Sequence, residues 1–228
     1  MSRNAHIIFF ATLNLLIGLT ALCPRSIDAG GNSPSIRFRW SFCAQTGLED
    51  RSEIVAITKD TPLHSGDRIK MFLQPVSTCY LYVLYYSSQG ELSLLYPTNL
   101  STREVPDANQ ILIPEGNHWL RLDGHTGPET FYLIASVKRL DHLEELIDRH
   151  LKPTGREDTT ISAEAIINEL KNLRRQHLKL AAPAERPVRL GGNLRDAAGQ
   201  QFVQDIRRFA IEISAQDFFS RTFTIDHQ

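Results

Sequence analysis

Short apolar runs separated by turn-forming residues occupy the chain from residue 36 to residue 136, a pattern typical of an antiparallel β-protein. Residues 36–42 alternate four large apolar side chains with three polar ones, which is the period of a strand with one buried face. Gly90 follows Ser88 and Gln89 and is expected to turn the chain between two strands, because glycine accepts a positive φ. The segments that we predict to be strands are 36–42, 53–58, 68–74, 79–87, 91–96, 111–114, 119–122 and 130–136.

After residue 136 the apolar spacing changes to the three and four residues of an amphipathic helix. It predicts helices over residues 140–151 and 163–178, the second of them capped by Ser162. The apolar stripe of the second helix consists of Ile166, Ile167, Leu170 and Leu173. Its other face carries Lys171, Arg174 and Arg175, which we interpret as a solvated face, with a binding patch as the alternative.

The last part of the chain is predicted to return to β-structure. Residues 181–187 are rich in alanine and proline and are typical of a linker. Residues 209–214 and 219–225 alternate apolar and polar side chains. With a turn at residues 215–217 between them, they predict a closing β-hairpin.

Because the strands recur about every ten residues and the helices come late, the pattern favours a mainly β fold with α additions. We expect an antiparallel, immunoglobulin-like β-sandwich with a two-helix insertion before the last strands. The predicted segments are a signal peptide over 1–29, a β-sandwich core over 30–136, a helical insertion and linker over 137–187, and a C-terminal segment with the closing hairpin over 188–228.

The N-terminal segment has the three parts of a secretory signal peptide: a basic start, an apolar run over residues 7–22, and a small residue at Ala29. The apolar run is shorter than the roughly 20 residues that a membrane-spanning helix needs, so cleavage near Ala29 is favoured over a retained anchor. Modification of Cys23 as a lipoprotein is the lesser alternative, because Leu22 precedes it where a small residue is usual. The chain is therefore predicted to be periplasmic or secreted, with no integral membrane span after cleavage.

Charge gives no indication of a polyanionic partner. Cleavage would remove Arg3, Arg25 and Asp28 from the 25 basic and 26 acidic residues of the whole chain, leaving 23 and 25, a net charge of −2. Such a balance provides no long-range attraction to phosphate backbones, so we expect no nucleic-acid partner.

Two cysteines, Cys43 and Cys79, would remain after cleavage. In an oxidising compartment they could form a disulfide, and the alternative is two separately buried thiols. Strand periodicity is an objection to the bond, since Cys43 shares the face of Arg37 and Arg39, whereas Cys79 shares the face of Leu81.

No recognisable catalytic, cofactor-binding or metal-binding motif is found. The histidines make no ligand pattern, and a metal site at His118 and His125 is a remote alternative. No serine lies in a G-x-S-x-G elbow. Asp123, Glu129 and Asp141 could be paired carboxylates, but nothing in the sequence brings any two of them together.

The tyrosines are the one feature with a functional interpretation. Tyr80, Tyr82 and Tyr86 share one face of the predicted strand at 79–87, whose other face is also apolar. One interpretation is that the second sheet covers one face and the helices cover the other. The alternative is an exposed aromatic surface that binds a glycan, peptide or protein.

The segment from Leu63 to Ser136 resembles the bacterial domain of unknown function 4384 family. The matching motifs are Ser65-Gly66-Asp67-Arg68, Tyr80-Leu81-Tyr82-Val83, Gly90, Leu95-Tyr96-Pro97, Ile113-Pro114 and Gly127-Pro128-Glu129. The resemblance implies an accessory domain of an exported or envelope protein, and it implies no catalytic residues.

We therefore predict an exported, non-catalytic binding or interaction module of the bacterial envelope. Its partner is expected to be another envelope protein, a peptide or a glycan, and no cofactor is expected. The alternatives are a hydrolase with a site assembled from scattered Asp, Glu and His residues, and a purely structural envelope component.

Overall fold

The computed structural model describes residues 35–47, 52–58, 61–100, 110–152, 161–177, 183–188 and 206–228. The predicted signal peptide, its cleavage point and Cys23 lie outside these residues. All of the described residues belong to one compact unit.

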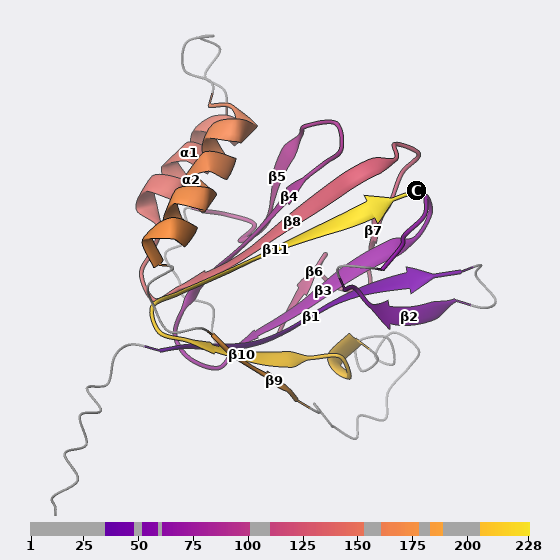
Figure 1. Ribbon diagram of the computed structural model, residues 1–228, viewed down its shortest axis with the longest axis horizontal. Helices are drawn as coiled ribbons and strands as arrows, with labels where there is room; N and C mark the ends of the chain where they lie inside the picture. The colour runs from indigo at the N-terminus through magenta and orange to yellow at the C-terminus, as the bar shows by residue number, and fades with distance from the viewer. Residues whose placement is uncertain are drawn as a thin grey trace, which may run out of the picture. The chain divides into compact units, whose positions relative to one another are not determined.

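Two antiparallel sheets pack face to face (Figure 1). The strands of sheet 1, in spatial order, are β6 (Ile111–Ile113), β3 (Arg68–Pro75), β1 (Ile36–Thr46), β10 (Ile211–Ala215) and β9 (Ala184–Pro187), with β2 (Glu53–Ala56) also paired to β1 and β7 (Leu120–Arg121) to β3. The strands of sheet 2 are β11 (Phe218–His227), β8 (Gly127–Ser136), β4 (Tyr80–Tyr86) and β5 (Leu92–Tyr96). The predicted antiparallel β-sandwich with a helical insertion is confirmed.

The main core lies between the two sheets and follows the alternation of β1. Every second residue of β1, from Ile36 to Ala44, points inward, and three of these side chains meet aromatic rings of sheet 2 at distances typical of aromatic pairs. The centroid separations are 5.5 Å for Phe38–Phe219, 4.9 Å for Trp40–Phe223 and 5.0 Å for Phe42–Phe131.

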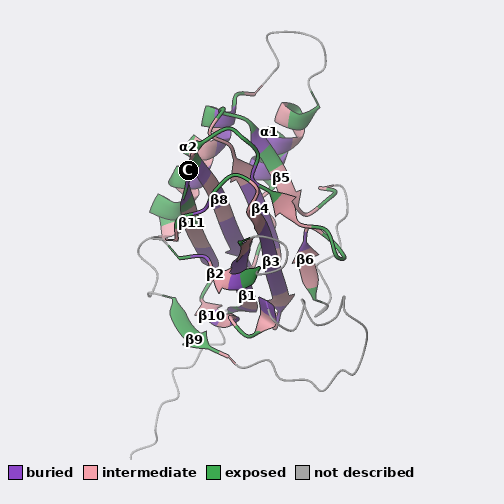
Figure 2. Cartoon of the chain, turned by 90° about the vertical axis from the view of Figure 1, so that its right-hand side faces the viewer, coloured by how far each residue is buried: buried purple, intermediate pink, exposed green. Residues whose placement is uncertain are grey.

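A second core lies on the outer face of sheet 2, beneath helices α1 (Asp141–Leu151) and α2 (Ala163–His177) (Figures 1 and 2). Leu143 and Ile147 of α1 and Ile166 of α2 are fully buried against strands β4 and β8. Sheet 2 is therefore covered on both faces, as the apolar residues on both sides of β4 require.

The predicted closing hairpin is wrong. Strand β10 pairs with β1 and β9 in sheet 1, whereas β11 pairs with β8 in sheet 2. Ile213 of β10 and Phe219 of β11 both face the core between the sheets, so each strand supplies one wall of that core and the turn crosses between them.

The predicted linker at 181–187 is also corrected, because residues 184–187 form the edge strand β9 on β10. All four of its residues are exposed, so the segment has no apolar alternation that could indicate a strand. An edge position accommodates Pro187, whose nitrogen has no hydrogen to donate.

Candidate functional site

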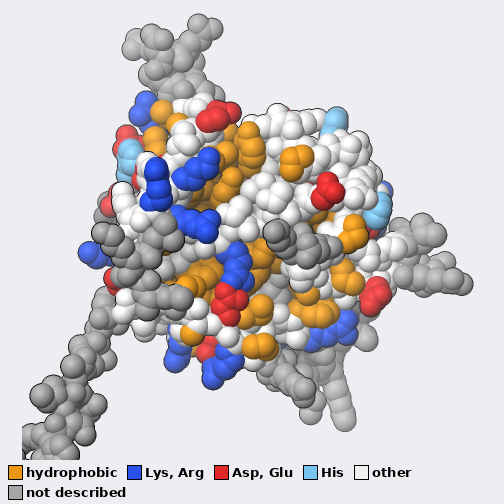
Figure 3. Space-filling model, in the orientation of Figure 1, with side chains coloured by type: hydrophobic (Ala, Val, Ile, Leu, Met, Phe, Trp, Pro, Cys, Tyr) orange, Lys and Arg blue, Asp and Glu red, His pale blue; other side chains and the backbone are white. Residues whose placement is uncertain are grey.

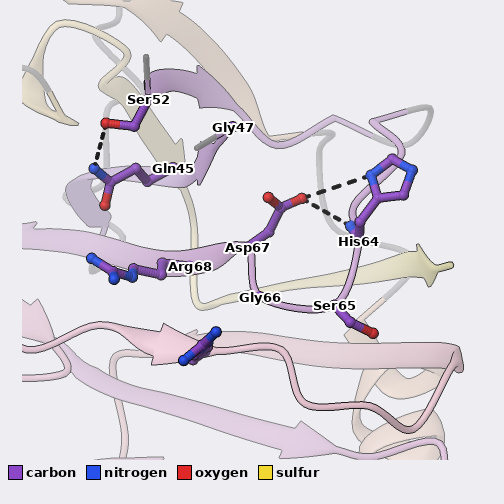
Figure 4. A pocket seen from close by; sticks show the side chains of 9 residues that line it. Gln45, Gly47, Ser52, His64, Ser65, Gly66, Asp67 and Arg68 are labelled. Carbon is purple, nitrogen blue, oxygen red and sulfur yellow. Dashed lines mark hydrogen bonds and ion pairs between the residues drawn. The ribbon is translucent and has the colours of Figure 1, made fainter. Parts of the chain in front are cut away.

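A hollow of about 430 Å³ opens at one end of the sandwich, where the loop after Leu63 enters β3 (Figure 4). We call it the end pocket, and it is lined by Gln45, Gly47, Ser52, His64, Ser65, Gly66, Asp67, Arg68 and Arg121. Two neighbouring hollows share part of this lining, one through Gly66 and Arg121 and the other through His64 and Asp67. The end pocket contains the whole Ser65-Gly66-Asp67-Arg68 motif.

Local hydrogen bonds fix the shape of this motif. A carboxylate oxygen of Asp67 accepts a hydrogen bond of 2.8 Å from the backbone N–H of His64 and lies 3.9 Å from its Nδ1 (Figure 4). Gly66 donates its backbone N–H to the carbonyl of Leu122 at 2.9 Å, and its φ of +97° is one that side chains rarely allow. The motif is thus a rigid turn attached to the strand that carries Arg121.

Two arginines stand side by side at the end pocket. Arg68 of β3 and Arg121 of β7 are directly opposite each other in an antiparallel pair, so their side chains leave the same face of the sheet. Arg68 has a further interaction elsewhere in the chain, whereas the side chain of Arg121 has no hydrogen bond or ion pair with any residue that the structure describes. Like charges placed opposite each other are unfavourable unless a counter-charge joins them.

A chain of polar side chains runs from the end pocket into the protein. The Ser65 Oγ lies 3.1 Å from Nε2 of His227, whose Nδ1 lies 3.8 Å from Oε1 of Glu129. The Glu129 carboxylate accepts hydrogen bonds from the Tyr85 hydroxyl at 2.5 Å and from the Ser88 hydroxyl at 3.0 Å. Burial, followed by this bond to Glu129, raises the pKa of Tyr85 well above its usual value.

Sequence reasoning named Glu129 as a candidate carboxylate but missed His227 as its neighbour. The two residues are far apart in the chain, and they meet because β8 and β11 pair with His227 opposite Gly127. A side chain at residue 127 would collide with Ser88, since a Cβ there would lie 2.9 Å from the Cβ of Ser88. The motif Gly127-Pro128-Glu129 was the available signal, because its glycine allows Ser88 to approach Glu129.

The tyrosine face is covered by helix α1. Tyr82 is only 1% exposed, and its hydroxyl donates to Glu144 at 2.6 Å and accepts the backbone N–H of Leu140 at 3.2 Å. Arg139 completes this attachment through an ion pair with Glu144. Burial and the bond to Glu144 raise the pKa of Tyr82.

Tyr80 and Tyr86 are half-buried and pack against the same core. The first of them borders a small hollow of about 150 Å³ between β4 and the segment 96–100. The three tyrosines therefore do not form one exposed aromatic surface.

Of the two alternatives for Cys43 and Cys79, the structure shows separately buried thiols and not a disulfide, because both are free cysteines in separate cores. Cys79 lies between the two sheets, whereas Cys43 lies on the outer face of sheet 1 beside Phe72 and Ala210. The alternation of side chains along β1 explains this separation, since Cys43 lies on the same outer face as Arg39 and Ser41.

Both thiols are expected to be unreactive in the native protein. Burial raises the pKa of Cys43 to about 12, despite opposing contributions from Ser41 and Arg208, and burial raises that of Cys79 to about 11. Since the thiolate is the reactive form, we expect Ellman's reagent at pH 8 to modify both thiols at least about 100-fold more slowly than a free cysteine. In the denatured protein without reductant, both thiols should react at the rate of a free cysteine. Two thiols that still failed to react would show that the disulfide is present.

The basic face of α2 borders a hollow of about 230 Å³ beside β8 and β11. Lys171 and Arg174 line it together with apolar residues such as Ile134 and Leu170. Figure 3 shows Lys and Arg side chains next to a strip of hydrophobic ones on the part of the surface where the helices lie. The basic face of α2 is thus exposed to solvent, and it borders apolar side chains of sheet 2 and of its own helix.

The remaining candidates do not converge within the described ranges. His125 pairs with Asp123 at 2.9 Å, which lowers the pKa of that carboxyl, and among the placed side chains no hydrogen bond joins His125 to His118. Those residues contain no cluster of three or more His, Cys, Asp or Glu side chains suited to a metal ion. Within them there is also no helix with the length and hydrophobicity to cross a bilayer.

Comparison with known families matches residues 63–139 to the model of a domain of unknown function, DUF4384. No curated protein and no solved structure matches the chain. The matched segment begins two residues before the Ser65-Gly66-Asp67-Arg68 turn and includes Arg121 and Glu129, but not His227. Residues 63–139 of the chain therefore match the DUF4384 family, as the motifs in this segment predicted.

Proposed function

We propose that the chain is an exported binding module of the bacterial envelope, and that the end pocket holds an anionic group of its ligand. The ligand would be an envelope protein, a peptide or a glycan that carries a carboxylate or a phosphate. The observation that carries the proposal is the placement of Arg68 and Arg121 directly opposite each other at the end pocket.

Physical chemistry supports an anion at this place. Two guanidinium groups on one face offer several parallel N–H donors, which suit the oxygens of a carboxylate or phosphate. Asp67 offsets part of this charge, but its carboxylate is engaged by the backbone of His64 and is only 11% exposed.

A purely structural role has less support. It predicts a broad apolar patch for contact with an assembly. Among the described residues, Leu151 is the only large apolar side chain that is exposed.

Binding is tested by titrating the protein with succinate and with inorganic phosphate, following backbone and arginine side-chain signals by NMR. We expect shifts at Gly66, Arg68 and Arg121, and Arg121→Ala should weaken binding at least about tenfold because a charge-assisted bond is lost. Arg121→Lys should retain part of the affinity. Arg37, an exposed arginine on β1, provides the control, since Arg37→Ala should bind as the wild type does. Uniform shifts, or equal weakening by both alanine variants, would refute an anion site here.

Export is tested by mass spectrometry of the protein from its native cell. We expect a mature N-terminus close to Gly30, because the apolar run and Ala29 fit signal-peptidase cleavage. A terminus at Met1 in the membrane fraction would show a retained anchor instead. A lipid on Cys23 would place the protein at a membrane surface.

A further inference from the structure

We propose that Ser65, His227 and Glu129 form a nucleophilic centre in the end pocket, which hydrolyses carboxylic esters whose acyl group carries a negative charge. The choice of an anionic acyl group depends on the proposed anion site, whereas the nucleophilic centre itself does not. A triad of this kind is recognised by geometry rather than by order in the sequence, so the absence of a G-x-S-x-G elbow does not oppose it.

The order of atoms is that of a serine activated by an imidazole. Ser65 is exposed and lines the end pocket, and its Oγ lies 3.1 Å from Nε2 of His227. The other ring nitrogen, Nδ1, lies 3.8 Å from Oε1 of Glu129. Each ring nitrogen therefore faces the group that its role requires, the nucleophile on one side and the orienting carboxylate on the other.

The burial of His227 and Glu129 distinguishes these three side chains from a chance contact at the protein surface. The His227 side chain is fully buried and that of Glu129 is 4% exposed. Within the described part of the chain, Nδ1 of His227 has no hydrogen-bond partner. A buried ring nitrogen is costly to leave unpaired, and a shift of about 1 Å toward Glu129 would satisfy it. Catalytic hydrogen bonds are commonly long in the free enzyme and shorten when substrate binds.

The Glu129 carboxylate is fixed in place by side chains from strand β4 and from the turn after it. The Tyr85 hydroxyl donates to Oε2 of Glu129 and the Ser88 hydroxyl donates to Oε1. Such outer bonds fix the carboxylate so that its remaining lone pairs face the imidazole. Glu129 would then stabilise the imidazolium that forms during the reaction.

The reaction would proceed in two steps. Ser65 Oγ attacks the ester carbonyl carbon while its proton passes to Nε2 of His227, and the tetrahedral intermediate collapses as the alcohol leaves with that proton. Water then attacks the acyl-serine, again giving a proton to His227, and Ser65 recovers that proton when the carboxylic acid departs. No oxidant, metal or co-reactant besides water is needed.

Charge on the tetrahedral oxygen would be stabilised by Arg121 rather than by backbone amides. The N–H groups of Ser65 and Gly66 already donate to the carbonyls of Gln228 and Leu122. Arg121 covers Gly66 closely enough that a Cβ added to that glycine would lie 3.6 Å from its Nη2. A guanidinium therefore lies beside the Ser65-Gly66 turn, where it can donate to an oxyanion formed on a substrate bound at Ser65.

The test is active-site labelling of the whole chain with a fluorophosphonate probe, which reacts with activated serines, followed by peptide mass mapping. We expect the label on Ser65, none there in Ser65→Ala, and labelling at least about 100-fold slower in His227→Gln. The exposed Ser93 on β5 is the control, because Ser93→Ala should label as the wild type does. Glu129→Gln should slow labelling too, and it provides a second variant if His227→Gln does not fold by circular dichroism.

Hydrolysis of two p-nitrophenyl esters separates the chemistry from the anion site. Arg68→Lys should slow hydrolysis of the anionic succinate half-ester more than that of the neutral acetate, because Arg68 belongs to the anion site alone. Arg121→Lys should slow both esters, and Ser65→Ala should abolish turnover of both. No label on Ser65, or equal labelling rates in wild type and folded His227→Gln and Glu129→Gln, would overturn the nucleophilic centre. Failure of the anion titration with Ser65 still labelled would overturn the proposed ligand class alone.

Discussion

Replacing Ile166 by aspartate is expected to lower the free energy of unfolding of the whole β-domain by about 4 kcal/mol, because it buries a charge without a partner. Ile166 lies on α2 with no exposed surface, in the core that the helices share with Tyr82 and Leu84 of sheet 2. For a domain of this size, such a loss lowers the melting temperature by roughly 10 °C.

Calorimetry and urea unfolding of the variant measure this effect. Asn168→Asp introduces the same side chain at an exposed position of the same helix and should change stability by less than about 0.5 kcal/mol. If Ile166→Asp left the melting of the β-domain unaltered, the helices would be an independent appendage. The tyrosines of β4 would then be available to bind a partner after all.

Most of the fold could be predicted from local pattern, because a sandwich strand with one buried face has a period of two. Residues 36–42 show that period, and β1 buries Phe38 and Trp40 as predicted. The apolar residues on both faces of β4 correctly indicated cover on two sides. Helix α2 was predicted at the right place, but the stripe did not tell which of its isoleucines is buried most: Ile166 has no exposed surface, whereas Ile167 is half-buried.

Strand pairing was predictable only where a tight turn fixes it. Gly90, with a φ of +84°, joins β4 to β5 as predicted. The turn at 215–217 looked equivalent in sequence, yet it sends β10 and β11 to different sheets. Alternation shows which face of a strand is buried, but not which strand it pairs with.

The end pocket depends on pairings of this non-local kind. Ser65 and Asp67 were visible as a motif, whereas Arg121 joins them through the pairing of β7 with β3 and His227 through the strand β11. A histidine near the end of the sequence gave no signal by itself. Only the register of β8 with β11 places it beside Glu129.

Replacing Lys70 by methionine is expected to lower the free energy of unfolding by about 2 kcal/mol at neutral pH. Lys70 lies on β3 and is 2% exposed, and its ammonium donates to the carbonyls of Gly116 at 2.6 Å and His118 at 2.5 Å. Methionine fills the same space but leaves both carbonyls without a donor, and hydrogen bonds to a charged group are worth about 1.5–3 kcal/mol each before the cost of burying the charge is subtracted.

The pH dependence of this difference has a definite sign. Burial lowers the pKa of Lys70 below its ordinary 10.5, so between the folded and unfolded pKa values the unfolded chain binds more protons. Stability must then rise with pH in that window, and it rises only in the protein that has the lysine. The stability gap between wild type and Lys70→Met should therefore widen as pH approaches 10.5.

Urea unfolding at a series of alkaline pH values measures the gap directly. Lys138 is exposed, so Lys138→Met should follow the wild type in parallel and correct for general alkaline effects. A constant gap would mean that Lys70 has the same proton affinity in both states, and a narrowing gap would mean that the folded protein binds the proton more tightly. In either case the contacts with the carbonyls of Gly116 and His118 would outweigh or balance the desolvation of the ammonium.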